Sequence, residues 1–404
     1  MTRKDYLNLI WKSYPAMPSD AQAAGRIYKI EKDGESLKLT LSRDNKIHKI
    51  EFAKAPEHSE FLLEGDLVAV VSATQIVLLA PQKSPLPKRI FNKDLLASWS
   101  EYLQGIKDFF TQEEFLELKT PSLVTCPGTE PSLDVFSTVL QVGSRKEKLY
   151  LPTSPELHLK KALALGAEKI FEIAPCYRNG EITERHQPEF LMLEWYRAYD
   201  NLSTIKKDVE KLVVYLAKKL KVEAPKKVRS VSIAELFKHY CDFDLKPDTT
   251  KEELKSLAEK LGVDVRSAES IDDYFFLIFM EKIESVLPAD ELIFVEKYPP
   301  YQAALARLTE DGWGDRFEVY WKGLELANAF HELNDPGIQR LRSNEDLEKK
   351  KDMGKEVVNL DEEFFQCLEA GMPPSGGIAL GVERLFMALQ NRPQISEIKV
   401  FPKA

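Results

Sequence analysis

The segment from Tyr177 to Tyr196 constrains the fold of this chain more than any other. It begins with a charged turn, Arg178-Asn179-Gly180-Glu181, and runs into the strand-like stretch Glu189–Tyr196. Residues two apart in a strand project from the same face, so Glu194 and Tyr196 are expected to point the same way. An arginine in the turn can hold an anion through parallel hydrogen bonds. Taken alone, the segment is typical of a charged hairpin with a solvated turn.

Two later segments carry related chemistry. The stretch Phe317–Leu333 is strand-like and holds three carboxylates, and Gly376–Leu385 is a glycine-rich strand that turns into a helix. Glu318 and Glu325 are seven residues apart, so a straight strand would point them to opposite faces. We expect a turn at Gly323, between them, to bring both carboxylates to one site.

Net charge and cysteine spacing exclude several classes of protein. The formal net charge of −9 over 404 residues argues against general coating of nucleic acid, which needs a dominant basic surface. The four cysteines are far apart and include no Cys-x-x-Cys pair, so neither a zinc site nor a disulfide framework is predicted. No apolar run approaches the roughly 20 residues of a membrane span, and the first residues lack an apolar signal core. We therefore expect a cytoplasmic protein without membrane contact.

The first part of the chain is predicted to form a small β domain. Residues 25–80 contain short stretches that alternate in period two, separated by turn residues such as Asp33-Gly34. Five such strands predict an OB-like β-barrel. Pro81, Pro85 and Pro87 mark a linker after it. The predicted domains are therefore residues 1–88 and residues 89–404.

The second part is predicted to be an α+β domain. From Asn92 the apolar residues recur with helical spacing, and Phe115–Pro121 then has the pattern of a strand closed by proline. Residues from about 203 to about 290 have mainly helical patterns. We expect them to form a helical insertion with little chemistry of its own.

Together these segments resemble a known family. Phe115–Pro121, Tyr177–Tyr196, Phe317–Leu333 and Gly376–Leu385 are similar to motif 1, motif 2, the acidic strand and motif 3 of class II aminoacyl-tRNA synthetases, most closely the lysine subclass. The resemblance covers residues 92–404. It implies a catalytic domain built on an antiparallel sheet, activation of an amino acid with ATP, and a homodimer formed through motif 1.

The resemblance also implies an ATP site. Arg178 matches the arginine that bridges the substrate carboxylate and the α-phosphate, and Arg384 matches the one that holds the far phosphate; fixed cations are needed because two anions must meet. The family usually reads Arg-x-Glu in motif 2, whereas here Gly180 takes the third place and Glu181 follows it. Glu181 is therefore the candidate for the adenine contact. The other matches are His186 for the triphosphate, Phe190 for the adenine ring, and Glu318 with Glu325 for Mg²⁺ on the phosphates.

The amino-acid pocket follows from the same resemblance. In lysine-specific members a carboxylate from each of two segments and a tyrosine surround the side-chain ammonium, and Glu194, Glu332 and Tyr196 match them. A desolvated ammonium needs such opposite charge. The further matches are Glu156 for the other amino group, Asn328 for the substrate carboxylate and Phe330 for a packing wall.

Three local features resemble the paralogue family that modifies elongation factor P, the elongation factor P (R)-β-lysine ligases. They are Ser154 where lysyl-tRNA synthetases usually have alanine, His331 before Glu332, and Ala379 in the glycine run of motif 3. The methyl group of Ala379 would crowd an α-ammonium and so favour β-lysine by about 1–3 kcal/mol. The hydroxyl of Ser154 offers a contact to the displaced amine. The predicted β domain is an argument against this second resemblance, since the ligase family commonly consists of the catalytic domain alone.

We therefore predict an ATP-dependent ligase that forms AMP and pyrophosphate. It would activate lysine or (R)-β-lysine as an adenylate and transfer the acyl group to a lysine of elongation factor P. The alternative is an abbreviated lysyl-tRNA synthetase that charges tRNA, and a third hypothesis is an inactive regulator that binds only amino acid or nucleotide. The preferred lysine isomer, the acceptor and the role of the β domain stay open at the level of sequence.

Overall fold

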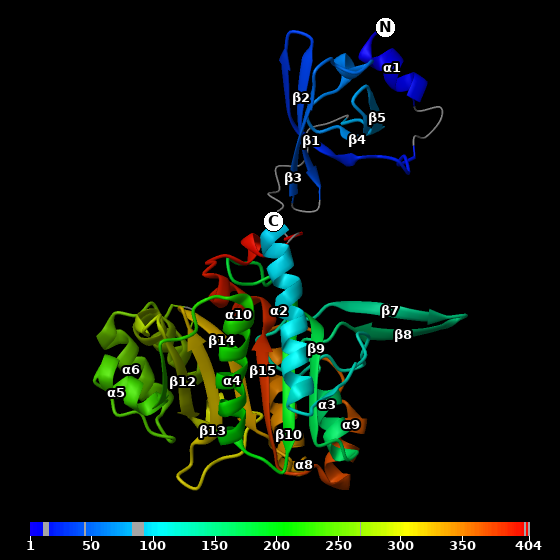
Figure 1. Cartoon of the computed structure of the whole chain (residues 1–404). Helices are drawn as coiled ribbons and strands as arrows, with labels where there is room; N and C mark the ends of the chain where they lie inside the picture. The colour runs from blue at the N-terminus through cyan, green and yellow to red at the C-terminus, as the bar shows by residue number, and fades with distance from the viewer. Residues whose placement is uncertain (11–15, 44–45, 83–92, 267, 400, 403–404) are drawn as a thin grey trace. The chain divides into compact units, whose positions relative to one another are not determined.

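The computed structural model describes residues 1–10, 16–43, 46–82, 93–266, 268–399 and 401–402. They form two compact units, Met1–Ala97 and Ser98–Ala404 (Figure 1). The linker prolines Pro85 and Pro87, and Asn92 at the expected start of the helical pattern, lie outside the described residues.

The first unit is a five-stranded antiparallel sheet with a short helix. Its strands follow the order β3-β2-β1-β4-β5, and the described residues show no pairing between the outer strands β3 and β5. The closed barrel expected from the strand count is therefore not seen. Of the two aromatic side chains on these strands, Phe52 is in the core at 2% exposure, whereas Tyr28 is 72% exposed. The elements are α1 (Arg3–Ile10), β1 (Ala23–Asp33), β2 (Ser36–Arg43), β3 (Lys46–Phe52), β4 (Leu67–Ser72) and β5 (Gln75–Ala80).

The second unit is built on an eight-stranded sheet in the order β11-β12-β13-β14-β15-β10-β9-β6. Its strands pair antiparallel except at the two ends, where β11 pairs parallel with β12 and β6 with β9. A mainly antiparallel sheet is what the resemblance implies for the catalytic domain. The strands are β6 (Leu116–Glu117), β9 (Lys169–Tyr177), β10 (Glu189–Ala198), β11 (Lys227–Ser232), β12 (Glu291–Tyr298), β13 (Gly314–Trp321), β14 (Leu324–His331) and β15 (Ser375–Gly381).

Helices α2 (Lys93–Gln112) and α4 (Leu202–Leu220) lie along one face of this sheet (Figure 1). On that face Phe110 of α2 contacts Trp195 of β10, with 5.2 Å between ring centroids, and α4 packs on β14 and β15. Side chains alternate along a strand, so burial of Trp195 under α2 leaves Glu194 on the opposite face. That opposite face carries the candidate site.

The remaining helices flank the sheet. Helix α3 begins at Glu156, immediately after the turn that contains Ser154, and packs against α9 and β10. The segment expected as a helical insertion also contributes β11, and its short helices form a separate core with β12. The bounds are α3 (Glu156–Ala164), α5 (Ile233–Cys241), α6 (Lys251–Leu261), α7 (Ile271–Ile278), the π-helix Phe279–Ile283, the 3₁₀ turn Glu284–Val286, α8 (Pro336–Asp352), α9 (Glu362–Gly371) and α10 (Val382–Gln390).

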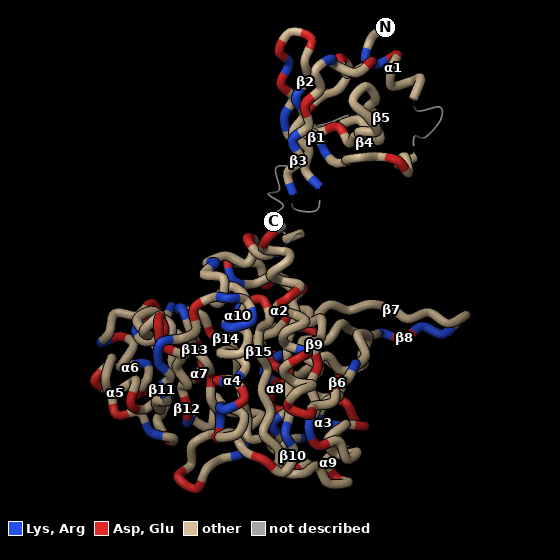
Figure 2. The backbone as a smooth tube through the Cα atoms, in the orientation of Figure 1, with Lys and Arg blue, Asp and Glu red and all other residues tan. Residues whose placement is uncertain are grey.

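A hairpin, β7 (Ser137–Val142) and β8 (Arg145–Tyr150), forms its own two-stranded sheet and extends away from the rest of the second unit (Figure 1). Basic residues gather along β8, whose sequence begins Arg-Lys-Glu-Lys (Figure 2). All six residues of β7 are exposed.

No helix within the described ranges combines the length and the apolar character needed to cross a bilayer.

Candidate functional site

Strand register brings the residues of the predicted site into rows on one face of the sheet. Glu194 on β10 pairs with Ala379 on β15, Ala379 pairs with Asn328 on β14, and Asn328 pairs with Glu318 on β13. Residues directly opposite each other in an antiparallel pair point to the same face. A parallel row runs through Tyr196, Gly377, Phe330 and Arg316. Segments far apart in the chain thus supply one continuous surface.

A β-bulge adds Glu325 to this surface. The register between β13 and β14 shifts after the pair Val319–Ala327, and the next pair is Tyr320–Glu325. The extra residue on β14 reverses the alternation, so Glu325 shares the face of Tyr320 and therefore of Glu318. The expected turn at Gly323 closes the hairpin, where Gly323 has a φ of 70°. The turn alone would leave Glu325 on the wrong face, and the bulge corrects its direction.

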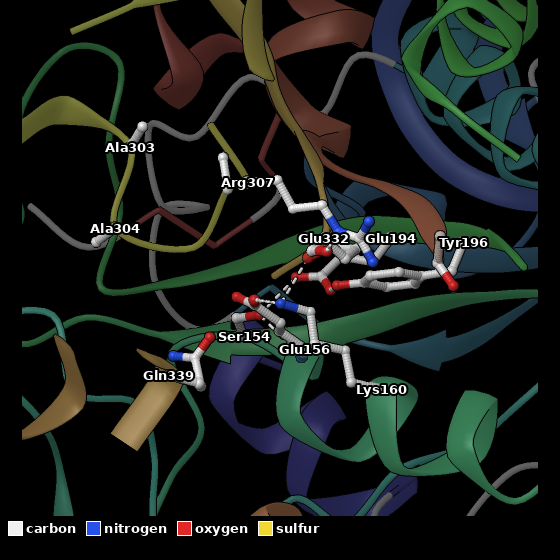
Figure 3. A network of polar contacts seen from close by, with 12 residues as sticks. Ser154, Glu156, Lys160, Glu194, Tyr196, Ala303, Ala304, Arg307, Glu332 and Gln339 are labelled. Atoms are coloured by element: carbon white, nitrogen blue, oxygen red, sulfur yellow. Dashed lines mark hydrogen bonds and ion pairs between the residues drawn. The ribbon is translucent and has the colours of Figure 1, made fainter. Parts of the chain in front are cut away.

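The buried carboxylate of Glu194 forms one wall of a polar pocket (Figure 3). Its Oε1 accepts a hydrogen bond of 2.5 Å from the Ser154 hydroxyl, and its Oε2 accepts one of 3.0 Å from the Tyr196 hydroxyl. Glu194 is fully buried. Burial, and then the nearby charge of Glu156, raises the pKa of Glu194 to about 8. At neutral pH this carboxyl therefore holds a proton that a bound cation would displace.

Lys160 lies at the centre of the same pocket and was not predicted from the sequence. Its Nζ is 2.5 Å from Glu156 Oε1 and 2.6 Å from Glu332 Oε2 (Figure 3). Lys160 and Glu332 are each 1% exposed. Burial raises the pKa of Glu332 to about 7 although the charge of Lys160 opposes the rise. The one signal in the sequence was the four-residue spacing of Glu156 and Lys160 on a helix.

Arg178 and its neighbours line a second part of the site. Its Nη1 is 3.8 Å from Glu181 Oε2, and its guanidinium carbon lies 5.2 Å from the centroid of the Phe190 ring. Its Nε is buried and has no hydrogen-bond partner among the described residues. A guanidinium with donors to spare beside a flat ring can receive an anion attached to an aromatic base.

Arg384 joins motif 3 to the acidic hairpin. Its Nη1 donates to the carbonyl oxygen of Glu325 at 2.9 Å and lies 3.4 Å from Glu325 Oε2, and its Nη2 contacts Nε2 of His186. Burial, followed by the charges of Arg384, Arg178 and Arg185, lowers the pKa of His186 to about 4. His186 is therefore neutral at pH 7, and the positive charge here comes from the arginines.

The two carboxylates of the acidic pair, Glu318 and Glu325, have different surroundings. Glu318 Oε2 accepts hydrogen bonds of 2.6 Å from the hydroxyls of Tyr298 and Tyr320, and its Oε1 contacts the guanidinium of Arg316. Burial and then the charge of Glu318 raise the pKa of Glu325. No group of three or more acidic, histidine or cysteine side chains in the described ranges forms a complete metal site. The two carboxylates suit Mg²⁺ that is also held by phosphates and water.

Two further residues at the site escaped sequence reasoning. Arg316 donates to Asn328 Oδ1 at 2.9 Å and so ties the predicted carboxylate contact to Glu318. Glu284, in the expected insertion, lies 3.7 Å from Arg185, and its pKa is raised by burial and then by Glu325. The segment expected to carry little chemistry thus contributes a charge near the acidic pair. His331, by contrast, pairs with Asp315 at 2.8 Å.

Comparisons with known proteins agree with this architecture. The family described as tRNA synthetases class II (D, K and N) matches residues 88–404. The elongation factor P–(R)-β-lysine ligase of Proteus mirabilis is 36% identical over 310 residues, which cover 75% of this chain and 93% of that protein. The protein of the same name from Hamiltonella defensa is 32% identical over 308 residues, with the same coverage of both chains. The lysine–tRNA ligase of Oceanobacillus iheyensis is 30% identical over 367 residues, covering 82% of this chain and 73% of the relative. The chain therefore belongs to the class II tRNA synthetase family (D, K and N).

Proposed function

We propose that this protein is an ATP-dependent ligase that activates lysine or (R)-β-lysine and transfers it to a lysine of elongation factor P. The observation that carries the proposal is the acidic pocket, in which Lys160 pairs with Glu156 and Glu332 and the buried carboxylate of Glu194 lies near both Glu156 and Lys160. One lysine beside three carboxylates leaves an excess of negative charge, which the two ammonium groups of a diamino acid would neutralise and an apolar substrate would not. Relatives named elongation factor P–(R)-β-lysine ligase match most of this chain and nearly their own full length.

The first step joins the amino acid to AMP. The two ammonium groups of the substrate would bind Glu156 on one side and Glu194 with Glu332 on the other, and its carboxylate would face Arg178 and Asn328. A carboxylate oxygen attacks the α-phosphorus of ATP while the bond to the bridging oxygen breaks and pyrophosphate leaves. Arg178 would neutralise the two anions as they approach, and Arg384, beside His186, would hold the departing phosphates.

The other residues of the site orient the nucleotide. Phe190 would stack on adenine, and Glu181, which lies near Arg178, is the candidate for the adenine amino group. Glu318 and Glu325 would hold Mg²⁺, which neutralises charge on the phosphates when bound. In the second step the amine of the acceptor lysine attacks the acyl carbon, the acyl–phosphate bond breaks, and AMP leaves with loss of a proton from the amine.

Ser154, Phe330 and Ala379 shape the pocket. The Ser154 hydroxyl donates to Glu194 and accepts from the backbone amide of Glu156 at 3.0 Å. We therefore assign Ser154 to orienting Glu194, in place of the expected direct contact with a displaced amine. Ala379 pairs with both Glu194 and Asn328, so its methyl group lies between the two ends proposed for the substrate. Phe330, two residues after Asn328 on β14, would pack against the bound amino acid.

A labelling assay with each acceptor tests which one receives the activated amino acid. Purified protein with ATP and labelled lysine or (R)-β-lysine is offered either elongation factor P or tRNA. We expect label on the protein acceptor and none on tRNA. Label on tRNA alone would make this chain an abbreviated lysyl-tRNA synthetase, a candidate favoured by the longer match to the lysine–tRNA ligase. Absence of amino-acid-dependent pyrophosphate exchange with either isomer would instead indicate an inactive regulator.

Gly377 gives a prediction about pocket size. A Cβ at this position would lie 2.1 Å from Glu332 Oε1 and 2.3 Å from Tyr196 Cε1. Gly377→Ala is therefore expected to raise the KM for the amino acid about 10- to 200-fold. The KM for ATP is the internal control, because the added methyl group meets no residue assigned to the nucleotide. Equal changes in both KM values in the exchange assay would contradict this local explanation.

The edge of the sheet supports a homodimer. Strand β6 is the outermost strand, and Leu116 on it is 63% exposed, while Leu123 in the loop after it is 50% exposed. This is the region that resembles motif 1. Exposed apolar side chains next to an open strand edge are typical of an interface with another chain. We propose that a second copy covers them, and equilibrium sedimentation would measure the mass of the assembly.

For the first unit we propose an OB-type fold. Its strand order corresponds to an OB sheet that is open between β3 and β5. Of its two candidate aromatic side chains for stacking on bases, Phe52 is in the core and only Tyr28 is exposed. Among the Phe, Tyr and Trp residues of this unit's described strands, Tyr28 is thus the one exposed ring, and one ring offers single-stranded RNA little stacking. This favours elongation factor P over tRNA as the acceptor, and with it a place in the cytoplasm.

A further inference from the structure

We propose that Lys160 is a positioning residue of the ligase, which offsets the negative charge of Glu156 and Glu332 and directs both carboxylates toward the amino groups of the substrate. This inference rests on the proposed function. It adds to that function a protein cation that acts only through its two carboxylate partners.

The geometry places one ammonium group between two assigned substrate contacts. Lys160 Nζ lies 2.5 Å from Glu156 Oε1 and 2.6 Å from Glu332 Oε2, so one ammonium group holds these two oxygens close together. Glu156 and Lys160 are one helical turn apart on α3, whereas Glu332 follows β14 (Figure 3). Lys160 thus joins a helix to the central sheet at the pocket. Without it, two neighbouring carboxylates would face each other and repel.

The charges of the pocket explain why a resident cation is needed. The groups that face Lys160 are Glu156 on its own helix, Glu332 after β14, and Glu194 with Tyr196 on β10. Arg307 donates to the carbonyl oxygen of Glu332 and to Asn334, and within the described ranges it makes no ion pair with these carboxylates. The three carboxylates carry three negative charges when all are ionised. Lys160 and the two ammonium groups of a diamino acid supply three positive charges, which match the negative charges of these three carboxylates.

Removal of the charge on Lys160 alters this balance in a defined way. With only the two substrate ammonium groups present, one carboxyl group would retain a proton at neutral pH and would bind its ammonium poorly. Higher pH would remove that proton. The defect should therefore appear in amino-acid binding, and it should diminish as pH rises, whereas a general loss of packing would have no such dependence.

Lys161 provides a matched control on the same helix. Its Nζ lies 2.7 Å from Asp361 Oδ2 and 2.7 Å from Glu363 Oε2, and the residue is 8% exposed. It is thus a second mostly buried lysine that bridges two carboxylates. Its partners belong to the contact between α3 and α9 and have no assigned role at the site.

The experiment compares Lys160→Met with Lys161→Met in amino-acid-dependent pyrophosphate exchange between pH 6.5 and 9. Lys160→Met is expected to raise the KM for lysine or (R)-β-lysine roughly 30-fold or more at pH 7, with the KM for ATP unchanged. The increase should become smaller toward pH 9. Lys161→Met should keep both KM values close to those of the wild type. An unchanged amino-acid KM in Lys160→Met, or a rise that is the same at every pH, would overturn the proposal.

Chemical rescue tests the same role if Lys160→Met fails to fold. Lys160→Ala lacks the three carbons and the nitrogen that propylammonium supplies. Added propylammonium is expected to lower the amino-acid KM of this variant, or to restore its folding, whereas propanol should not. Equal effects of both compounds, or no effect of either, would reject the ammonium role. If the wild type shows no exchange with either isomer, the proposed function and this role fail together. If the wild type is active and both Lys160 variants resemble it, the role of Lys160 fails alone.

Discussion

Replacement of Arg178 by alanine is expected to lower amino-acid-dependent pyrophosphate exchange by about 10³-fold or more, the effect of removing a cation that stabilises charge at a reacting phosphate. The guanidinium makes one ion pair, at 3.8 Å with Glu181, and its Nε has no partner among the described residues. It therefore contributes little to the folded structure by itself. The loss should appear in kcat as well as in KM, because the arginine meets both anions at the transition state.

A surface arginine serves as the control for this substitution. Arg266 pairs with Asp264 at 2.6 Å and is exposed on the second unit. Arg266→Ala removes the same charge and should leave exchange unchanged. Thermal unfolding of both variants would show whether either has lost stability. If Arg178→Ala retains more than about a tenth of the wild-type rate, the assignment of Arg178 to the reacting anions is wrong.

Glu194→Gln is expected to weaken amino-acid binding by about 10²-fold or more, because it removes one partner of a buried charge pair. In the wild type, the amino-acid KM should fall as pH rises from 6 to 8. The reason is that Glu194, with a pKa of about 8, and Glu332, with a pKa of about 7, must lose their protons to bind ammonium groups. In Glu194→Gln the part of this dependence due to Glu194 should vanish. The KM for the amino acid, measured against pH for both proteins, checks this.

The same substitution should increase stability at alkaline pH. The pKa of Glu194 is raised from 4.5 to about 8 in the folded protein. The folded state therefore binds this proton more tightly than the unfolded state, so its stabilising effect is full below pH 4.5 and is lost as pH rises through 8. Glutamine cannot ionise and can still hydrogen-bond with Ser154 and Tyr196. Urea unfolding should therefore show Glu194→Gln to be more stable than the wild type at pH 9, with a smaller difference at pH 5. A larger advantage at pH 5 would show that burial of the charge is not the cause.

Much of the site was predictable from residue type and spacing within single segments. Glu194 and Tyr196 lie two apart on β10, and they share a face for that reason alone. Arg178 stands in the turn before this strand, and the glycine-rich run before Arg384 forms β15 as expected. Such local features need no knowledge of distant contacts, since strand alternation and turn chemistry depend on neighbouring residues.

Contacts between distant segments were the part that sequence reasoning missed. The bulge that turns Glu325 toward Glu318 depends on how β14 pairs with β13, and a single strand carries no sign of it. Lys160 has the pattern of an ordinary helical lysine until Glu332, far along the chain, is placed beside it. Glu284 likewise acquires its surroundings only when the segment before β12 folds against the sheet.

By itself, the sequence determined the family, the strand that carries Glu194 and Tyr196, and the charged groups available for two anions and two ammonium groups. The tertiary structure decided which of these groups meet, how deeply they are buried and how far the pKa values of Glu194 and Glu332 rise. In the described part of the first unit, it also left β3 and β5 unpaired with each other. The physical reason is that burial and electrostatic coupling depend on the distances between side chains from separate elements, which local patterns do not encode.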